Sequence, residues 1–390
     1  MPQSMIRGHI IELCPNDKQA THLSKACGVA RLSYNWALAE WQSQFQADKD
    51  YRQDCLKQNI NVNKDKLNAP SQGKLRKQLN AIKREQFPFM LEVTKCSPQL
   101  AIMQLGDAFK RFFAGQGKYP QFRKKGVDDR FSLSNDQFRV DGKLIKIPNL
   151  GWVKMRESLR FNGKILSAKV FRRGGKWFIS IAVELTELPA KAMQRMQSTG
   201  QSVGIDLGIS SLATLSNGEI RPNIKALRNK LAKLRRESKA LSRKDKGSAN
   251  RAKAKTKLGK LHYQISCIRQ NLLHQLTTEL VTQYDVICIE DLNVKGMMKN
   301  RKLARSIADV GFCEFKRQLI YKAIQCGKTV KSVDRFFPSS KTCSVCDEIN
   351  HNLTLSMRLW TCDTCQTLHN RDVNAAKNIL RYADKVLTVA

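Results

Sequence analysis

Two pairs of cysteines near the carboxyl end of the sequence most constrain how this chain can fold. Each pair has the form Cys-x2-Cys, and fifteen residues separate the pairs. This spacing brings two knuckles around one tetrahedral Zn²⁺, and four thiolates leave no open position for a substrate. We therefore expect a structural zinc module. Asp347 and Gln366 follow the knuckles where glycine is common, which predicts strained turns. The four expected ligands are Cys343, Cys346, Cys362 and Cys365.

The charge balance points to a polyanionic partner. Lys and Arg number 69 and Asp and Glu 33, a formal net charge of +36, while 42% hydrophobic residues allow a folded chain. Self-repulsion at this charge favours a partner that neutralises the surface, and nucleic acid is the first candidate. No apolar run approaches the roughly 18 residues of a membrane span, and the first fifteen residues lack the apolar core of a signal peptide. We expect a cytoplasmic protein associated with the nucleoid.

Apolar periodicity divides the chain into three parts. From Asn16 to about Phe113, apolar residues recur at three- and four-residue steps, which predicts helices on either side of a polar segment at 48–71, itself a loop or a frayed helix. Between 119 and 187 the period is two, and turn signals predict hairpins that pair 131–140 with 143–147 and 165–171 with 177–185. After a polar linker, strands at 203–206 and 286–290 flank a long helix with an apolar stripe from Leu258 to Leu280.

Two basic segments are candidate contacts for nucleic acid. Between Arg221 and Lys260 there are sixteen Lys or Arg residues against two acids. A solvated helix face is the alternative, but such an excess of one sign is costly without phosphates opposite. The second segment, 110–125, interleaves aromatics; base stacking is possible there, but we assign Phe109, Phe112 and Phe113 to the core. The candidate contacts are Lys124, Lys125, Arg235, Arg236, Arg243, Lys244, Arg251 and Lys253.

Three carboxylates stand beside apolar segments. Asp206 ends an apolar strand bracketed by glycines, Glu290 ends another, and Asp372 opens the final helical segment. Each alone could be a turn or cap residue. Together they would repel one another unless divalent cations held them, and oxygen ligands suit Mg²⁺ or Mn²⁺. A pair of such ions would support hydrolysis of a phosphodiester. Of the scattered histidines only His369 lies near these residues, with proton transfer or a structural role as its alternatives.

In these segments the sequence resembles the TnpB/OrfB family of transposon-encoded proteins, relatives of type V CRISPR effectors. Residues 204–208, Gly-Ile-Asp-Leu-Gly, are similar to the first RuvC motif of that family. Residues 289–293, Ile-Glu-Asp-Leu-Asn, resemble the second, and 371–379, Arg-Asp-Val-Asn-Ala-Ala-Lys-Asn-Ile, the third. Residues 335–343, the lead-in to the cysteines, also match, as do 34–38 and 148–154. The order of these motifs makes the resemblance specific over nearly the whole chain.

The resemblance implies a multidomain α/β fold. It combines an RNase H-like RuvC nuclease domain interrupted by a zinc ribbon with a wedge β-barrel that contains an inserted helical recognition lobe. The expected boundaries are 1–13 and 119–190 for the wedge barrel, 14–118 for the helical lobe, 191–202 for the linker, 203–337 and 367–390 for the RuvC-like domain, and 338–366 for the zinc module.

The resemblance also implies an activity. It predicts an RNA-guided DNA endonuclease in which Asp206, Glu290 and Asp372 hold Mg²⁺ or Mn²⁺, with structural Zn²⁺ at the cysteines. The expected partners are a guide RNA and double-stranded target DNA, in a ribonucleoprotein that contains one copy of the chain. Two alternatives stay open: a nucleic-acid-binding regulator that does not cut, and a transposase that joins DNA ends.

Overall fold

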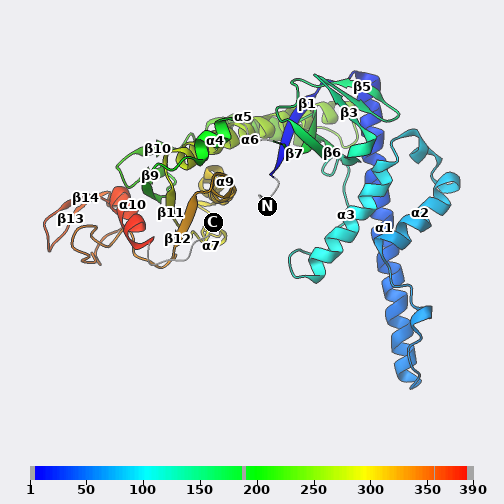
Figure 1. Cartoon of the computed structure of the whole chain (residues 1–390), viewed down its shortest axis with the longest axis horizontal. Coiled ribbons are helices and arrows are strands. Elements are labelled where there is room, and N and C mark those ends of the chain that lie inside the picture. The colour runs from blue at the N-terminus through cyan, green and yellow to red at the C-terminus, as the bar shows by residue number, and fades with distance from the viewer. Residues whose placement is uncertain (1–4, 187–189, 355, 384–390) are drawn as a thin grey trace. The chain divides into compact units, whose positions relative to one another are not determined.

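The computed structural model describes residues 5–186, 190–354 and 356–383. The chain forms two compact units, Met1–Glu187 and Leu188–Ala390, which we call the N-terminal and C-terminal units (Figure 1). None of the helices in these described ranges is long and apolar enough to cross a membrane.

Three helices form one part of the N-terminal unit: α1 (Asp17–Lys57), α2 (Gln72–Gln86) and α3 (Cys96–Phe113). Helix α1 begins with a capping box, in which the Asn16 side chain accepts from the backbone N–H of Gln19 and the Gln19 side chain accepts from that of Asn16. This satisfies two N–H groups that the helix itself leaves unpaired. Short 3₁₀ turns occur at Lys64–Lys66, Pro88–Glu92 and Asn135–Gln137.

Of the two alternatives for the polar segment from residue 48, the loop is wrong for its first ten residues, because α1 continues to Lys57. The reason lies in Asp48, whose buried carboxylate accepts from the backbone N–H groups of Asn68 (2.6 Å) and Ala69 (2.8 Å). This acid stays helical while it fastens the segment that follows the helix. Its polarity therefore marks a tertiary contact and not a break in the helix.

Two antiparallel sheets complete the N-terminal unit. The first contains β1 (Ile6–Leu13), β7 (Lys176–Leu185), β6 (Gly163–Arg173) and β2 (Arg130–Ser134), in that order. The second contains β3 (Arg139–Asp141), β4 (Leu144–Ile147) and β5 (Gly151–Lys154). The two sheets and the helices share one hydrophobic core, to which Ile11, Leu23 and Ile145 all belong.

The structure confirms one expected hairpin and corrects the other. Strands β6 and β7 pair around Gly174 and Gly175, both with positive φ. In the 131–147 segment only β3 and β4 form the hairpin, whereas β2 pairs with β6 in the other sheet. The alternation of apolar and polar residues identifies a strand but not its partner. The sequence pattern therefore did not separate β2 from β3.

The C-terminal unit begins with α4 (Ala190–Met196), inside the segment expected to be a linker. The residues after α4 are fastened by Asp285, whose carboxylate accepts from the Ser198 hydroxyl (2.6 Å) and from the N–H of Thr199 (2.9 Å) and Gly200 (2.7 Å). The polar residues of this segment therefore bind the carboxylate that precedes β11. The linker expected at 191–202 contains most of α4 and the segment that Asp285 binds, and residues 187–189 of the adjoining boundary lie outside the described residues.

A five-stranded mixed sheet is the centre of the C-terminal unit. Its order is β10-β9-β8-β11-β12, with β8 (Ser202–Asp206), β9 (Ser211–Leu215) and β10 (Ile220–Pro222) antiparallel and β11 (Val286–Glu290) and β12 (Thr329–Val333) parallel to β8. Its core packs against α6 (Ala249–Gln283) and α9 (Phe312–Cys326), through residues such as Leu273 and Phe315.

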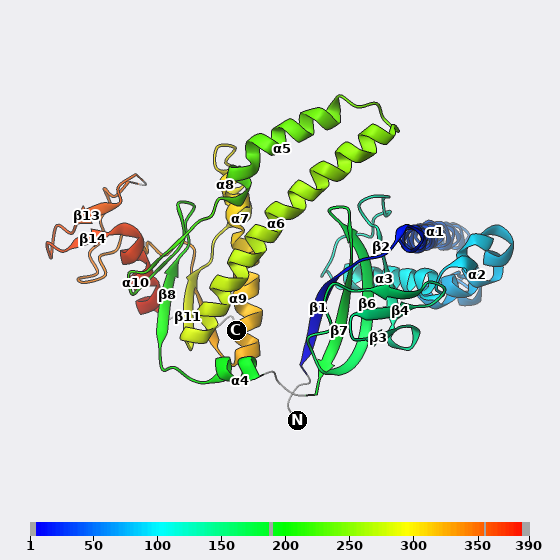
Figure 2. The ribbon, with the colours of Figure 1, turned by 90° about the horizontal axis from the view of Figure 1, so that it is seen from above.

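The remaining helices and strands surround this sheet. Helix α5 (Ala226–Ser242) pairs with the first part of α6 in a long hairpin (Figure 2), and α7 (Val294–Met297) and α8 (Ala304–Val310) follow β11. Strands β13 (Leu359–Thr361) and β14 (Leu368–Asn370) pair with each other next to the final helix, α10 (Arg371–Tyr382). The cysteine module therefore extends to Asn370, four residues beyond the expected boundary at 366, because β14 pairs with β13 and not with the central sheet.

Candidate functional site

Parallel pairing places Asp206 and Glu290 at the same edge of the central sheet. Ile205 of β8 lies opposite Ile289 of β11, and each carboxylate is the last residue of its strand. The residues that precede each acid in its strand are mostly buried, which explains the apolar runs in the sequence. Neighbouring parallel strands that end together present their last side chains together.

Helix α10 brings Asp372 to this edge because it packs against β8 without a side chain between them. A Cβ built on Gly204 would lie 2.0 Å from the carbonyl oxygen of Ala376 and 2.7 Å from the backbone nitrogen of Leu380. Only glycine permits this approach. Asp372 lies in the first turn of α10, whose N-cap Asn370 accepts from the N–H groups of Asp372 (3.1 Å) and Val373 (3.2 Å).

The three carboxylates line one cavity of about 590 Å³. Its wall also includes Lys341, Thr354 and Arg371. Burial raises the pKa of Asp206 to about 7, and the carboxylates of Asp372 and Glu290 add to the rise, opposed by Arg371 and Arg358. Burial also raises the pKa of Glu290, with Asp291 contributing. Carboxyl groups that resist ionisation in this way favour a bound cation, which removes the cost of their negative charge.

The carboxylates are neighbours but do not form a closed cluster. Among the described residues, only the four cysteines are a group of three or more whose ligand atoms all lie within 4.8 Å of one another. Asp372 instead accepts from Arg358, whose Nη1 lies 2.9 Å from Oδ1 and 3.2 Å from Oδ2. Oxygen donors on one cavity fit Mg²⁺ or Mn²⁺, ions that usually keep several waters between themselves and the protein.

Asp291, the acid next to Glu290, is already neutralised. Its carboxylate accepts from Lys316 (2.9 Å) and from Arg335. The hydrogen bond from Lys316, followed by that from Arg335, holds the pKa of Asp291 below its usual range. Of the two consecutive acids, Glu290 is therefore the one that faces the cavity without such a partner among those described.

Sequence reasoning missed Arg358 entirely. It is an exposed residue immediately before β13, in a segment without a recognisable pattern. The backbone N–H of Arg371 donates to the carbonyl of Arg358 (2.8 Å), which holds this segment against the start of α10. No local signal identifies an arginine that meets an acid fourteen residues later across a turn.

The four cysteines form the expected cluster. Their sulfurs lie within 4.8 Å of one another, close enough for one tetrahedral ion at about 2.3 Å from each. The strained turns are confirmed: Asp347 has φ 65° and Gln366 has φ 57°. In each knuckle the N–H of this residue donates to the carbonyl of the first cysteine, at 3.1 Å and 2.9 Å. The donor set and spacing fit a structural zinc ion.

His369 belongs to the cysteine module. Its buried Nε2 lies 3.1 Å from Sγ of Cys343, and its ring packs against Trp360 at a centroid distance of 4.7 Å. It is not among the residues that line the carboxylate cavity. The geometry supports the structural alternative for this residue over proton transfer.

The basic candidates on α5, on α6 and in the loop between these helices fall into two groups. Arg235, Arg236, Arg243, Lys244 and Lys253 are exposed. Arg251 is half-buried, and its guanidinium donates to the carbonyls of Leu241 (3.1 Å) and Lys244 (2.7 Å). It therefore closes the tip of the helical hairpin, where it satisfies carbonyls at the end of α5.

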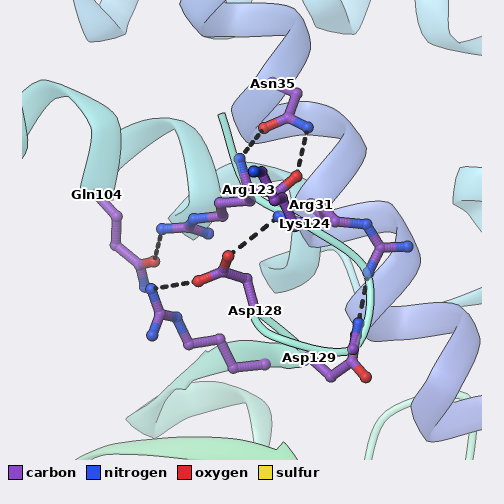
Figure 3. A network of polar contacts seen from close by, with 9 residues as sticks. Arg31, Asn35, Gln104, Arg123, Lys124, Asp128 and Asp129 are labelled. Carbon is purple, nitrogen blue, oxygen red and sulfur yellow. Dashed lines mark hydrogen bonds and ion pairs between the residues drawn. The ribbon is translucent and has the colours of Figure 1, made fainter. Parts of the chain in front are cut away.

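Lys124 and Lys125 are exposed on a loop that a polar network fixes between α1 and α3 (Figure 3). Asn35 of α1 pairs with the backbone of Arg123 in both directions, at 2.7 Å and 3.0 Å. Arg123 donates to Gln104 of α3 (2.8 Å), and the N–H of Lys124 donates to Asp128 (3.0 Å). These hydrogen bonds therefore hold the backbone of the loop that carries the two lysines.

The assignment of the nearby aromatics to the core is correct for Phe109, which is buried, and wrong for Phe113, which is 68% exposed. The helical spacing of these rings is compatible with a buried face. However, α3 ends at Phe113, and its last turn extends beyond the core.

Three family models match the sequence. One described as a probable transposase of the OrfB type matches residues 180–301, and one described as a Cas12f1-like TNB domain matches 312–379. A helix-turn-helix model matches residues 1–50, where the described residues form β1 and most of α1.

Curated relatives extend over nearly the full length. A protein of Streptomyces pristinaespiralis, named "Putative RNA-guided DNA endonuclease", is 36% identical over 97% of this chain and 90% of its own. InsQ of Escherichia coli K12 carries the same description and is 30% identical over 96% and 92%. Among solved structures, Cas12f1 in complex with sgRNA and target DNA aligns with a TM-score of 0.53 at 14% identity, over 95% of this chain and 84% of that one, which shows a shared fold. The chain therefore belongs to the TnpB/OrfB family that its sequence motifs resemble.

Proposed function

We propose that the protein is an RNA-guided DNA endonuclease whose catalytic centre is the cavity lined by Asp206, Glu290 and Asp372. The observation that carries this proposal is the convergence of three acids, distant in sequence, on one cavity of a strongly basic chain. A single acid at the end of a strand has many structural explanations. Three acids that line one cavity have no structural role in common. The names of the full-length relatives support the same activity.

The domain around this cavity is, in this proposal, an RNase H-like RuvC domain. Its support is the strand order, with three antiparallel strands followed by two strands parallel to the first. The wedge barrel and the recognition lobe would lie in the N-terminal unit, where the helices and both sheets share one core.

The carboxylates would hold Mg²⁺ or Mn²⁺, and a bound pair of such ions supplies an activated water and stabilises the leaving oxygen. Asp206, held by β8 and α10, is the most enclosed of the three groups and would fix the ions relative to the sheet. Glu290 and Asp372 would supply the other oxygen ligands, Asp372 once Arg358 no longer binds its carboxylate. The freed guanidinium would then face the phosphate, where a positively charged donor lowers the energy of a pentavalent transition state.

The guide RNA and the double-stranded target DNA would bind through the basic surfaces. The exposed residues Arg235, Arg236, Arg243, Lys244 and Lys253 and the fixed lysines 124 and 125 are the proposed contacts. Their charges would displace counterions from the phosphates. The four cysteines would hold Zn²⁺ as a structural ion.

The decisive experiment compares the purified ribonucleoprotein with its Asp206→Asn variant on guide-matched DNA and Mg²⁺. The proposal is supported if cleavage disappears in the variant while guide-dependent DNA binding stays within about twofold of the original. Removal of a catalytic group typically lowers the rate of an enzyme by about 10³-fold or more. Asp107→Asn is the matched control, because Asp107 is an exposed acid on α3. If the original protein shifts the DNA without cutting it, the non-cutting regulator is the better description, and joined DNA ends would indicate a transposase.

A further inference from the structure

Helix α10 carries a buried polar face that binds the backbone of the cysteine module. Asn374 and Asn378, four residues apart and so on one face of the helix, are 2% and 0% exposed. Asn378 Nδ2 donates to the carbonyls of Ser339 (2.8 Å) and Thr342 (2.6 Å). A buried amide group without hydrogen bonds would destabilise the fold, and these bonds satisfy the Nδ2 of Asn378, although its Oδ1 has no partner among the described residues.

Asn374 binds the backbone on both sides of Cys343, the first of the expected zinc ligands. Its Nδ2 donates to the carbonyl of Thr342 (2.7 Å), and its Oδ1 accepts from the N–H of Ser344 (2.9 Å). These two residues are the neighbours of Cys343 on either side. One side chain of α10 therefore fixes the peptide groups before and after a cysteine of the cluster.

A second attachment reaches the same module one turn later. Arg381 forms a bidentate pair with Asp347 (2.8 and 2.6 Å), and the Tyr382 hydroxyl donates to the same carboxylate (3.1 Å). Asp347 is the knuckle residue with φ 65°. Its strained turn is therefore held by the helix on which Asp372 lies.

The opposite face of α10 packs against the central sheet through apolar and backbone contacts. There the backbone of α10 lies close to Gly204 of β8. Ile379 of the same helix and its C-cap Ala383 are buried in a small hydrophobic cluster with residues of β11 and β12. Apolar packing of this kind contains no directional bond, whereas hydrogen bonds of fixed geometry define the position of the helix along its axis. The polar face supplies those bonds, two residues after Asp372.

We propose that Asn374 and Asn378 are positioning residues that couple the cysteine cluster to the catalytic carboxylate of Asp372. The module would then do more than stabilise itself: with its metal bound, it holds α10 in the register that places Asp372 on the cavity. The catalytic role of Asp372 in this inference rests on the proposed function. The coupling between the cysteine cluster and α10 stands without it.

The test uses the full-length ribonucleoprotein with Asn374→Ala, Asn378→Ala and the double variant. Loss of a group that supports a metal ligand typically changes metal affinity or activity by about 10–100-fold. We expect zinc release to a chelator to be about tenfold faster, and the Mg²⁺ concentration for half-maximal cleavage to rise about tenfold, with guide-RNA affinity within about twofold. Two controls are matched. Asn229→Ala removes an exposed bond from an asparagine to the carbonyl of Ile224 (2.9 Å), and Leu273→Ala destabilises the sheet core elsewhere.

Hydrogen exchange of the α10 amides separates this inference from the nuclease assignment. Removal of zinc from the original protein should increase exchange across Asn374–Tyr382 by about tenfold or more, and in the double variant it should cause no further increase. Zinc release and exchange that respond in this way support the coupling even if the protein does not cut DNA, an outcome that overturns only the proposed function. The coupling is overturned if α10 ignores zinc removal in the original protein, or if Leu273→Ala, at an equal loss of Tm, changes zinc release as much as the asparagine variants do.

Discussion

Gly204 of β8 and Ala376 of α10 touch through their backbones: a Cβ on Gly204 would lie 2.0 Å from the Ala376 carbonyl oxygen. This contact explains why a glycine precedes Asp206 by two residues. It lets the helix that carries Asp372 approach the strand that carries Asp206, so the same glycine determines packing and the geometry of the cavity.

The first prediction follows from that contact. Gly204→Ala should push α10 away from the sheet, lower the stability of the protein by about 1–3 kcal/mol as an overpacked contact does, and reduce cleavage more than guide-RNA binding. Thermal unfolding and single-turnover cleavage measure the two effects. Gly259→Ala is the control, since a Cβ there meets nothing within 4 Å and the residue lies inside α6; alanine should be neutral or stabilising by up to about 1 kcal/mol. Equal behaviour of the two variants would contradict the role of Gly204.

Arg358 provides a second prediction. If its guanidinium meets the phosphate after Asp372 is released, Arg358→Ala should slow cleavage at saturating Mg²⁺ by about 10²–10³-fold, as removal of a charge-stabilising donor does. Arg317→Ala serves as the control, because Arg317 forms a bidentate pair with Glu314 on α9. A variant at Arg358 that cuts at the original rate with a lower Mg²⁺ requirement would show instead that this arginine only competes with the metal for Asp372.

The sequence allowed much of this site to be predicted, for a physical reason. Apolar runs of β length with one acid at the end could be recognised locally, and parallel pairing then placed Asp206 beside Glu290. The cysteine spacing likewise predicted a cluster, and the absence of glycine after the knuckles predicted the positive φ of Asp347. In each case the pattern and its cause lie within a few residues of each other.

What could not be predicted depends on partners far away in the sequence. The bonds of Asn374 and Asn378 go to backbone carbonyls, which every residue possesses, so no side-chain pattern marks them. The pairing of β2 with β6 and the pinning of a loop by Asp48 have the same character. The exposure of Phe113 depends on where the core stops, which helical periodicity does not state.

A third prediction concerns salt. Replacement of the five exposed residues Arg235, Arg236, Arg243, Lys244 and Lys253 by glutamine should reduce the slope of log K for RNA binding against log salt by about 3–5, if each contacts a phosphate. Arg251→Gln should leave that slope nearly unchanged and lower Tm instead, because its guanidinium binds the carbonyls of Leu241 and Lys244. Filter binding at several salt concentrations measures both. An unchanged slope in the fivefold variant would mean that this surface is only solvated.

A fourth prediction concerns pH and the pair of Asp285 with Lys328. The hydrogen bond from Lys328 (2.5 Å), followed by that from Ser198, lowers the pKa of Asp285 below its ordinary value. A carboxyl group whose pKa is depressed by folding stabilises the protein above its unfolded pKa, about 3.9, and loses that contribution as the pH falls below it. Asp285→Asn should therefore lower Tm at pH 7 and pH 5 alike, with a difference that narrows below about pH 4. A constant difference down to pH 3.5 would contradict this, and the exposed Asp245→Asn should show little effect at any pH.

The two knuckles offer a final, internally controlled prediction. Asp347 and Gln366 occupy equivalent left-handed positions, at φ 65° and 57°, where an L-residue costs roughly 1–2 kcal/mol relative to glycine. Gln366→Gly removes this strain and one exposed hydrogen bond, to the carbonyl of Asp363, so it should slow zinc release. Asp347→Gly removes the same strain but also the bonds from Arg381 and Tyr382, and it should therefore accelerate zinc release in spite of the relaxed backbone. Chelator-driven zinc release measures both variants under one condition. If both glycines slow release equally, the carboxylate of Asp347 contributes nothing to the module, and strain alone governs the knuckles.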